Sequence, residues 1–380
     1  MQTSFTFLLG ALALAACAAG DVASPDVHAM TTRGSAHGTP GAVYTLTNQT
    51  DGNSVAIFDR AATGQLTFAG SVSTGGAGTA AGLGSQSAIV LSDDDKWLLG
   101  VNAGSNDISI FNVAPSGIAL VHRVASGGER PVSVAIRRNI VYVLNAGGAG
   151  NIAGFTIDAQ GILTPLAGST QPLSAPNAGG AQVSFTPDGR ALVVAERATN
   201  LIGVYPLDAA GRAMAPVFHA SSGVTPFGFD FDERGTLIVS EAFGGMPNAS
   251  ATSSYRVGED GALEIVTGSL GTMQTAACWL VVSKDGRFAW TANAGSSSLT
   301  GYAVAQDGSL SLIDADGVTA STGVNAGATD MAISGNGRFL YVLTPRTGMV
   351  AAYEVGADGR LTAVPGAGGL PAGTVGLAAR

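Results

Sequence analysis

The chain has 380 residues, a net charge of −9 and only 12% charged residues. Nucleic-acid binding needs clustered Lys and Arg to neutralise phosphates, and no such cluster occurs, so a nucleic-acid partner is excluded. The 55 glycines are typical of a chain with many turns and few long helices.

Residues 1–16 are predicted to be a signal peptide of the lipoprotein type. The apolar stretch "FTFLLGALALAA" (5–16) is too short to span a bilayer in the mature protein. It ends in "LAAC", which resembles the bacterial lipobox, so Cys17 is predicted to carry a lipid that anchors the protein to a membrane. The alternative is an ordinary secretory peptide cleaved after an alanine. We therefore expect an exported protein, and the lipobox favours a periplasmic or outer-membrane lipoprotein.

Residues 17–41 follow as a predicted flexible tether, because they are small, polar and contain proline. The rest of the chain, 42–380, is predicted to be one domain built from internal repeats. Seven times an aromatic residue is followed six positions later by a glycine, at intervals of 44 to 53 residues. The pairs are Phe58/Gly64, Phe111/Gly117, Phe155/Gly161, Tyr205/Gly211, Tyr255/Gly261, Tyr302/Gly308 and Tyr353/Gly359.

The sixth unit, residues 277–320, indicates what one repeat contains. Four short apolar or alternating runs, "CWLVVS", "RFAWTAN", "LTGYAVA" and "SLSLIDA", are separated by "KDG", "AGSSS" and "QDG". Asp-Gly between alternating runs is a hairpin signal, since glycine accepts the positive φ of a tight turn. Each unit is therefore a four-stranded antiparallel meander, which must stack on its neighbours to bury both faces. This pattern predicts an all-β fold, a seven-bladed β-propeller.

The first unit lacks an innermost strand, because "AVYTLTN" at residue 42 matches a second strand. The C-terminal segment "LPAGTVGLAAR" (370–380) resembles the first strand of the third unit. We expect residues near 373–379 to complete the first blade and close the ring, which removes the free sheet edges.

The repeat strings "FLYVLT", "VYVLNA", "FAWTANAG", "TPDGR" and "DGRLT" resemble the lactonase family of seven-bladed propellers, which includes phosphogluconolactonases and the carboxymuconate cyclase. The resemblance covers residues 42–380. It implies a His near the start of the second blade and an Arg-His pair in the fourth. Gln86 stands near the first position, and Gln182, with Ala181, stands at the second. A carboxylate at the end of the following strand is present as Glu196, with Arg197 beside it.

The candidate site is predicted from positions where the polar residue differs from the one that the other repeats carry. Second strands mostly end in an amide or hydroxyl (Asn48, Asn102, Asn145, Asn293, Thr344), but the fourth and fifth end in Glu196 and Glu241. A carboxylate in a partly desolvated channel mouth acts as a general base when its pKa is raised. Arg197 or Arg346 would hold an anionic substrate, and Gln86, Gln182 and Gln274 would line the mouth. The alternative is that both glutamates accept hydrogen bonds from loop N–H groups.

The sequence has no Cys/His set with zinc spacing and no phosphate-binding loop, so no metal or cofactor is expected. Two functions remain open. One is hydrolysis of a sugar or muconate-type lactone, or another anionic metabolite, by carboxylate-activated water. The other is a non-catalytic envelope propeller that binds a ligand or a protein. The sequence indicates no oligomeric state.

Overall fold

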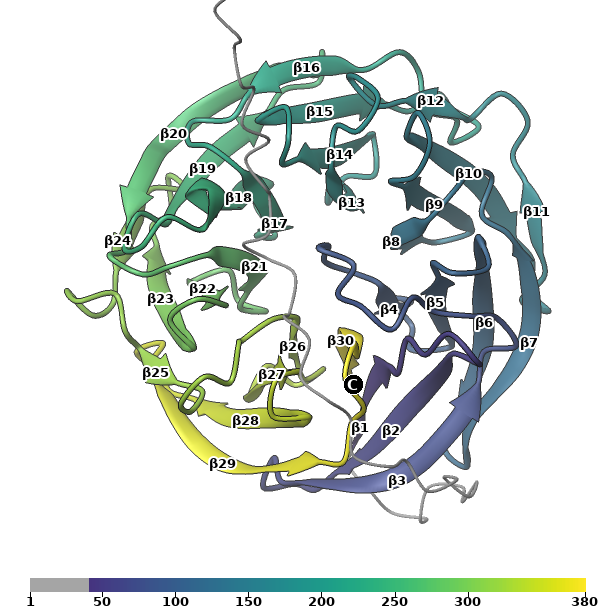
Figure 1. Ribbon diagram of the computed structural model, residues 1–380. Helices are drawn as coiled ribbons and strands as arrows, with labels where there is room; N and C mark the ends of the chain where they lie inside the picture. Colours follow the sequence, from purple (N-terminus) through teal and green to yellow (C-terminus); the bar gives the residue numbers. More distant parts are fainter. Residues whose placement is uncertain (1–40) are drawn as a thin grey trace, which may run out of the picture.

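Seven four-stranded antiparallel sheets stand around a central axis in the computed structural model (Figure 1). It describes residues 41–380, so the predicted signal peptide, Cys17 and all but the last residue of the predicted tether lie outside the described residues. The predicted all-β, seven-bladed propeller is confirmed.

Each sheet runs from an innermost strand at the channel to an outermost strand at the rim. Blade 1 contains β30 (Val375–Ala379), β1 (Gly41–Leu46), β2 (Ser54–Arg60) and β3 (Leu66–Ser73). Blade 2 contains β4 (Ile89–Leu91), β5 (Trp97–Asn102), β6 (Asp107–Ala114) and β7 (Gly117–Ala125). Blade 3 contains β8 (Pro131–Arg137), β9 (Ile140–Asn145), β10 (Asn151–Ile157), β11 (Leu163–Pro165) and the short β12 (Gln171–Pro172). Blade 4 contains β13 (Gly180–Phe185), β14 (Ala191–Glu196), β15 (Leu201–Pro206) and β16 (Val217–Ala220).

The remaining three blades follow the same order. Blade 5 contains β17 (Pro226–Phe231), β18 (Thr236–Glu241), β19 (Ala251–Val257) and β20 (Leu263–Gly271), with the 3-10 helix η1 (Phe243–Gly245) in its longest loop. Blade 6 contains β21 (Ala277–Val282), β22 (Phe288–Asn293), β23 (Ser298–Val304), β24 (Leu310–Leu312) and the short β25 (Ala320–Ser321). Blade 7 contains β26 (Met331–Ile333), β27 (Phe339–Thr344), β28 (Met349–Val355) and β29 (Leu361–Gly368). Within residues 41–380, no helix has the length and apolar character needed to cross a membrane.

The C-terminal strand closes the ring, as expected. β30 pairs with β1 in an antiparallel register that places Ala379 opposite Val43. The Thr45 hydroxyl donates to the Gly376 carbonyl at 2.6 Å, and the Arg380 N–H donates to the Ala42 carbonyl at 3.0 Å. Strands from opposite ends of the chain therefore form one sheet.

The repeated aromatic–glycine spacing reflects packing between blades. The aromatic residue lies buried on the third strand, and the glycine turns the chain into the fourth; Gly211, for example, has φ +80°. In several blades a ring from the preceding blade donates to the carbonyl of this glycine. The Tyr142 hydroxyl donates to Gly211 at 2.8 Å, and the Trp290 indole N–H donates to Gly359 at 3.0 Å. The spacing thus combines a turn with a bond between neighbouring blades.

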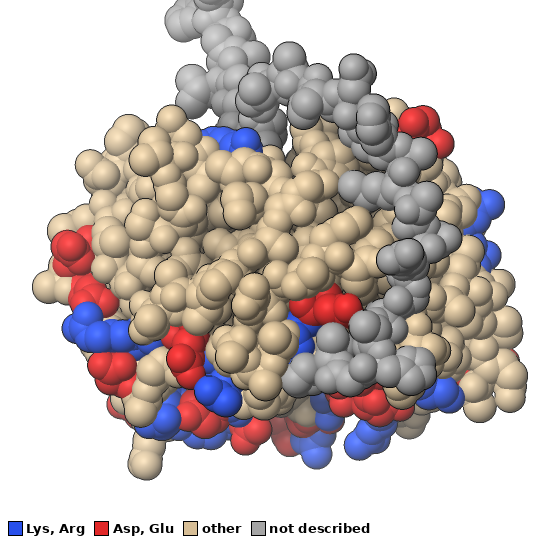
Figure 2. Space-filling model, turned by 90° about the horizontal axis from the view of Figure 1, so that it is seen from below, with Lys and Arg blue, Asp and Glu red and all other residues tan. Residues whose placement is uncertain are grey.

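The two faces of the ring differ in charge. We call the face built by the first-to-second and third-to-fourth strand turns the turn face. The opposite face is built by the second-to-third strand loops and the connections between blades, and we call it the loop face. Figure 2 views the propeller from the side, and the Lys, Arg, Asp and Glu side chains crowd along its lower part, the turn face. Most of the remaining visible surface is uncharged.

Candidate functional site

The central channel holds a cavity of about 450 Å³ that extends toward the turn face. Residues of the innermost strands line it, and polar groups make up the larger part of its surface. A second space of about 200 Å³ between β4, β8 and β13 shares lining residues with it. A concave cavity in which several polar groups converge is a candidate small-molecule site.

Residues 83–87, which we call the plug, close the channel on the loop-face side. The loop between β3 and β4 reaches into the centre of the ring (Figure 1). The plug contacts blades on several sides: the Ser85 hydroxyl donates to Val132 in blade 3, and its carbonyl accepts from the Trp279 indole in blade 6, both at 2.8 Å. The Gln86 N–H donates to Ala181 in blade 4 at 2.9 Å. The channel is therefore blind, with its opening on the turn face.

Two predicted site residues, Gln86 and Gln182, lie in the floor of this cavity. The side-chain amides of both residues already form hydrogen bonds to backbone groups. Gln86 Nε2 donates to the Leu280 carbonyl at 2.7 Å, and Gln86 Oε1 accepts from the Leu280 N–H at 2.9 Å. Gln182 makes the same pair of bonds to Phe229, at 2.9 and 2.7 Å. Each amide thus completes the exposed edge of another innermost strand, as a neighbouring strand would.

Two carboxylates that were not predicted from the sequence also line the cavity, Asp230 on β17 and Asp330 just before β26. Asp230 accepts from the Val282 N–H at 2.9 Å, and Asp330 accepts from the Gly376 N–H at 2.9 Å. Burial raises the pKa of Asp230 to about 6, although two backbone N–H groups and the Lys284 charge act in the opposite direction. Burial raises the pKa of Asp330 to about 7. Both carboxyl groups therefore titrate near neutral pH.

The mouth of the cavity carries charges of both signs. Lys284, Asp93 and Asp95 line the larger space, and Arg137 lines the smaller one. The positive charges of Lys284 and Arg137 attract an anionic ligand to the mouth, beside the acidic turn that contains Asp93 and Asp95. The histidines of the described chain, His122 on β7 and His219 on β16, lie on outermost strands away from the channel.

The predicted catalytic residues Glu196 and Glu241 are fully buried outside the channel cavity. Glu196 accepts from the Ser174 N–H at 2.9 Å, from the Thr199 hydroxyl at 2.7 Å and from the Ser174 hydroxyl. Glu241 accepts from the Gly223 N–H at 2.7 Å and from the hydroxyls of Ser253 and Ser269 at 2.5 and 2.6 Å. These contacts favour the structural interpretation, in which each carboxylate holds a connection between blades against its second strand.

The three other predicted residues lie apart from the cavity. The Arg197 guanidinium is 5.7 Å from the centre of the Phe227 ring and packs against Gly84 of the plug. Burial, with a smaller contribution from Arg130, lowers its pKa. Arg346 is exposed in the loop after β27. Gln274 accepts from the Ser298 hydroxyl and donates to the Asp316 carbonyl.

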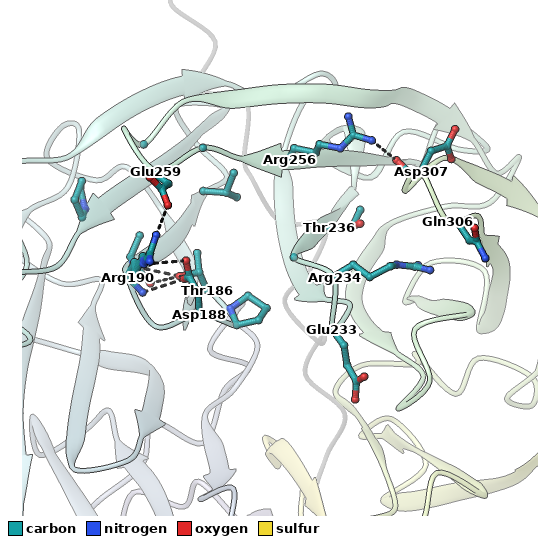
Figure 3. A pocket seen from close by; sticks show the side chains of 17 residues that line it. Thr186, Asp188, Arg190, Glu233, Arg234, Thr236, Arg256, Glu259, Gln306 and Asp307 are labelled. Atoms are coloured by element: carbon teal, nitrogen blue, oxygen red, sulfur yellow. Dashed lines mark hydrogen bonds and ion pairs between the residues drawn. The ribbon is translucent and has the colours of Figure 1, made fainter.

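A separate groove of about 530 Å³ lies on the turn face, between blades 4 and 5 (Figure 3). Its charges largely satisfy one another. Arg190 pairs with Glu259, and Arg256 donates to the Asp307 carbonyl at 3.0 Å. Arg234 forms two bonds to the buried carboxylate of Asp232. Because these groups already have partners, the channel is the better candidate site.

The signal that would have identified Asp230 was present in the repeat. The equivalent positions on the six other innermost strands are small or apolar, so Asp230 is a charged exception; they are Val90, Ala135, Ser184, Val281, Ala332 and Ala379. The predicted carboxylates, Glu196 and Glu241, stand at the ends of second strands, where Asp230 does not lie. Asp330 is harder to identify from the sequence, because it precedes a strand of only three residues.

A family model described as "Lactonase, 7-bladed beta-propeller" matches residues 43–178, 150–266 and 250–374. A solved protein from Lactobacillus plantarum is 19% identical with a TM-score of 0.72, over 90% of this chain and 99% of that one. The periplasmic gluconolactonase of Pseudomonas aeruginosa is 17% identical with a TM-score of 0.66, over 88% of this chain and 98% of that one. A 6-phosphogluconolactonase of Yersinia enterocolitica is 33% identical over 60 residues, which are 16% of this chain and 18% of that protein. The match thus spans less than a fifth of this curated relative.

Proposed function

Because the chain belongs to the lactonase family of seven-bladed β-propellers, we propose that it hydrolyses the ring ester of a small sugar or muconate-type lactone inside the blind channel. The observation that carries this proposal is the pair Asp230 and Asp330, two carboxyl groups of raised pKa in one cavity. The cavity volume of about 450 Å³ falls in the range of small-molecule sites.

In the proposed reaction, Asp230 is the general base and Asp330 is the general acid. Asp230, with the lower pKa, is mostly ionised at neutral pH and takes a proton from water. The water oxygen then bonds to the lactone carbonyl carbon, and the ring C–O bond breaks. Asp330, with the higher pKa, gives its proton to the departing alkoxide, which leaves an open-chain hydroxy acid. Lys284 and Arg137 at the mouth attract an anionic substituent on the substrate.

A pH-indicator screen of sugar and muconate lactones tests the proposal. We expect hydrolysis by the parent, with a rate that rises as Asp230 ionises and falls as Asp330 ionises. Asp230→Asn and Asp330→Asn should each lower kcat/KM about 100-fold or more. Asp316→Asn, an exposed substitution outside the channel, is the control. Activity that survives the double substitution would overturn this acid–base pair.

Catalysis by Glu196 or Glu241 stays a prediction that the same assay checks. If Glu196→Gln and Glu241→Gln remove hydrolysis from a folded protein, while the two aspartate variants keep it, the site lies at these glutamates. The bonds of Gln86 and Gln182 to the backbone favour the second candidate function, a propeller that binds a ligand without turning it over. Binding of a lactone without hydrolysis would establish that function.

We place the protein in the cell envelope, anchored by lipid on Cys17. The support is the "LAAC" sequence after an apolar stretch. Cys17→Ser should move the protein from the membrane fraction to the soluble periplasmic fraction. Parent protein that is already soluble there would contradict the anchor.

A further inference from the structure

The loop face is almost without charge. Its second-to-third strand loops and blade-to-blade connections carry few charged residues within residues 41–380, and of these Asp330 is buried and Arg197 is half-buried. The charged side chains still exposed there are Asp51, Glu129, Arg130 and Arg346. Arg130 and Arg346 form no ion pair with any described residue. The opposite turn face carries the crowded charges seen in Figure 2.

The loop face also exposes large apolar side chains. Val224, Met246, Met273 and Val324 are 40%, 54%, 52% and 90% exposed, and we call these four residues the apolar patch. They lie in four different loops of blades 5 to 7. Eight other large apolar side chains of residues 41–380 are also exposed, mostly on outermost strands and turns. The four named here lie on a face poor in charge, where exposed apolar groups indicate an interaction surface.

Hydrogen bonds link these loops into one surface. The Phe243 N–H donates to the Val224 carbonyl at 3.1 Å, which joins the first loop to the one with Met246. The Asn248 N–H donates to the Thr275 hydroxyl at 3.0 Å, which joins it to the loop with Met273. The Thr275 carbonyl accepts from Gly295, and the Thr322 N–H donates to Ser297, which continues the series to the loop with Val324. The patch is therefore held by a rigid framework.

The chain outside the described residues is long enough to present either face to a membrane. Gly41 lies at the turn face, 24 positions along the chain from Cys17. A chain of this length extends to about 80 Å, whereas a six-residue strand is about 20 Å long. The anchor alone therefore does not fix the orientation of the propeller.

We propose that the loop face is a lipid-binding surface, which docks the propeller on a phospholipid bilayer through the apolar patch. The side chains of the patch enter the interfacial region, and Arg130 and Arg346 meet the lipid phosphates. The charged turn face, which would lose its hydration against lipid, stays in water. The plugged end of the channel then faces the membrane, and the open end faces the aqueous phase. This orientation rests on the proposed envelope location and is independent of the proposed hydrolysis.

The Cys17→Ser full chain tests the surface without its anchor. We expect it to sediment with vesicles of phosphatidylethanolamine and phosphatidylglycerol. Met246→Ser with Met273→Ser should weaken this binding about tenfold. Leu120→Ser with Ile265→Ser, at comparably exposed positions on the outermost strands β7 and β20, is the matched control and should bind as the parent does. Absence of vesicle binding by the parent, or equal loss in both double variants, would overturn the proposal.

Orientation is measured on the lipidated full chain in proteoliposomes. An environment-sensitive dye on Val324→Cys should shift to the blue, whereas the same dye on Ile265→Cys should not. If size-exclusion chromatography instead shows a dimer that Met246→Ser dissociates, and vesicle affinity does not change, a second copy covers the patch and the proposal fails. Neither experiment measures lactone hydrolysis. If the proposed hydrolysis proves wrong, the conclusion about membrane binding is therefore unaffected.

Discussion

The buried carboxylates of this propeller differ in what surrounds them. Glu241 accepts three close hydrogen bonds, from the Gly223 N–H and the hydroxyls of Ser253 and Ser269. The Asp330 carboxyl accepts from the Gly376 N–H and interacts with its own backbone N–H, beside an open cavity. A carboxylate whose oxygens accept several hydrogen bonds holds the donating loops in place. A desolvated carboxylate with few hydrogen bonds has a raised pKa and can take up and release a proton near neutral pH.

We expect Glu241→Gln to destabilise the fold by about 1–3 kcal/mol, because its amide turns a donor toward groups that need an acceptor. Glu259→Gln, at an exposed ion pair on the turn face, should cost less than about 1 kcal/mol. Urea unfolding of both variants measures the difference. Hydrolysis at a temperature where Glu241→Gln is folded should be unchanged. Activity lost at full stability would instead place Glu241 in the chemistry.

The raised pKa values of Asp230 and Asp330 make stability depend on pH. Between the usual Asp value and the raised values of about 6 and 7, the native state holds protons that the unfolded state has released. These groups therefore stabilise the fold at acidic pH, and this contribution is lost as pH rises through 6 and 7. The double variant Asp230→Asn/Asp330→Asn should lack this loss, which for the two groups together amounts to about 4 kcal/mol between pH 5 and pH 8. Parallel melting curves of parent and variant across that range would contradict the assignment.

At the scale of elements, the Gln86 side chain is one of the contacts that hold the plug, and it pairs with blade 6 as a neighbouring strand would. Gln86 donates to and accepts from the backbone of Leu280, so Gln86→Ala leaves both groups of that residue without a partner. We expect a loss of about 1–3 kcal/mol and faster amide hydrogen exchange at Leu280. Gln306→Ala, at an exposed turn, is the control and should change neither quantity. Unaltered exchange at Leu280 would mean that the plug is held by its other contacts.

The elements were predictable to very different degrees. The blades followed from the repeat, because Asp-Gly turns and alternating strands are local signals, and "LPAGTVGLAAR" matched the strand missing from blade 1. The plug did not, because the loop between β3 and β4 has neither charge nor periodicity, and its path depends on contacts with blades 3, 4 and 6. Gln86 and Gln182 line the floor of the cavity instead of its mouth, and their bonds to the backbone depend on strand spacing that sequence does not reveal.

At the scale of the whole molecule, the ring depends on β30. Deleting residues 370–380 removes Val375, Leu377 and Ala378 from the core and leaves β1 as a free edge. The fold should lose about 5 kcal/mol or more, measured as a lower melting temperature and a broader transition. A synthetic peptide of residues 370–380 should restore part of this loss, since it supplies the same strand. A truncated protein that melts like the full chain would show that closure contributes little.

The closure also sets the order in which the molecule is completed. The Thr45 and Gly376 pair joins residues 331 positions apart, so blade 1 begins near the start of synthesis and lacks its inner strand until the end. Domains generally fold from the N-terminus as the chain emerges, and here the first blade must wait for the last residues. A chain that is cut short during translation cannot close its ring, however many blades it has formed. A chain that lacks residues 375–379 therefore exposes the unpaired edge of β1.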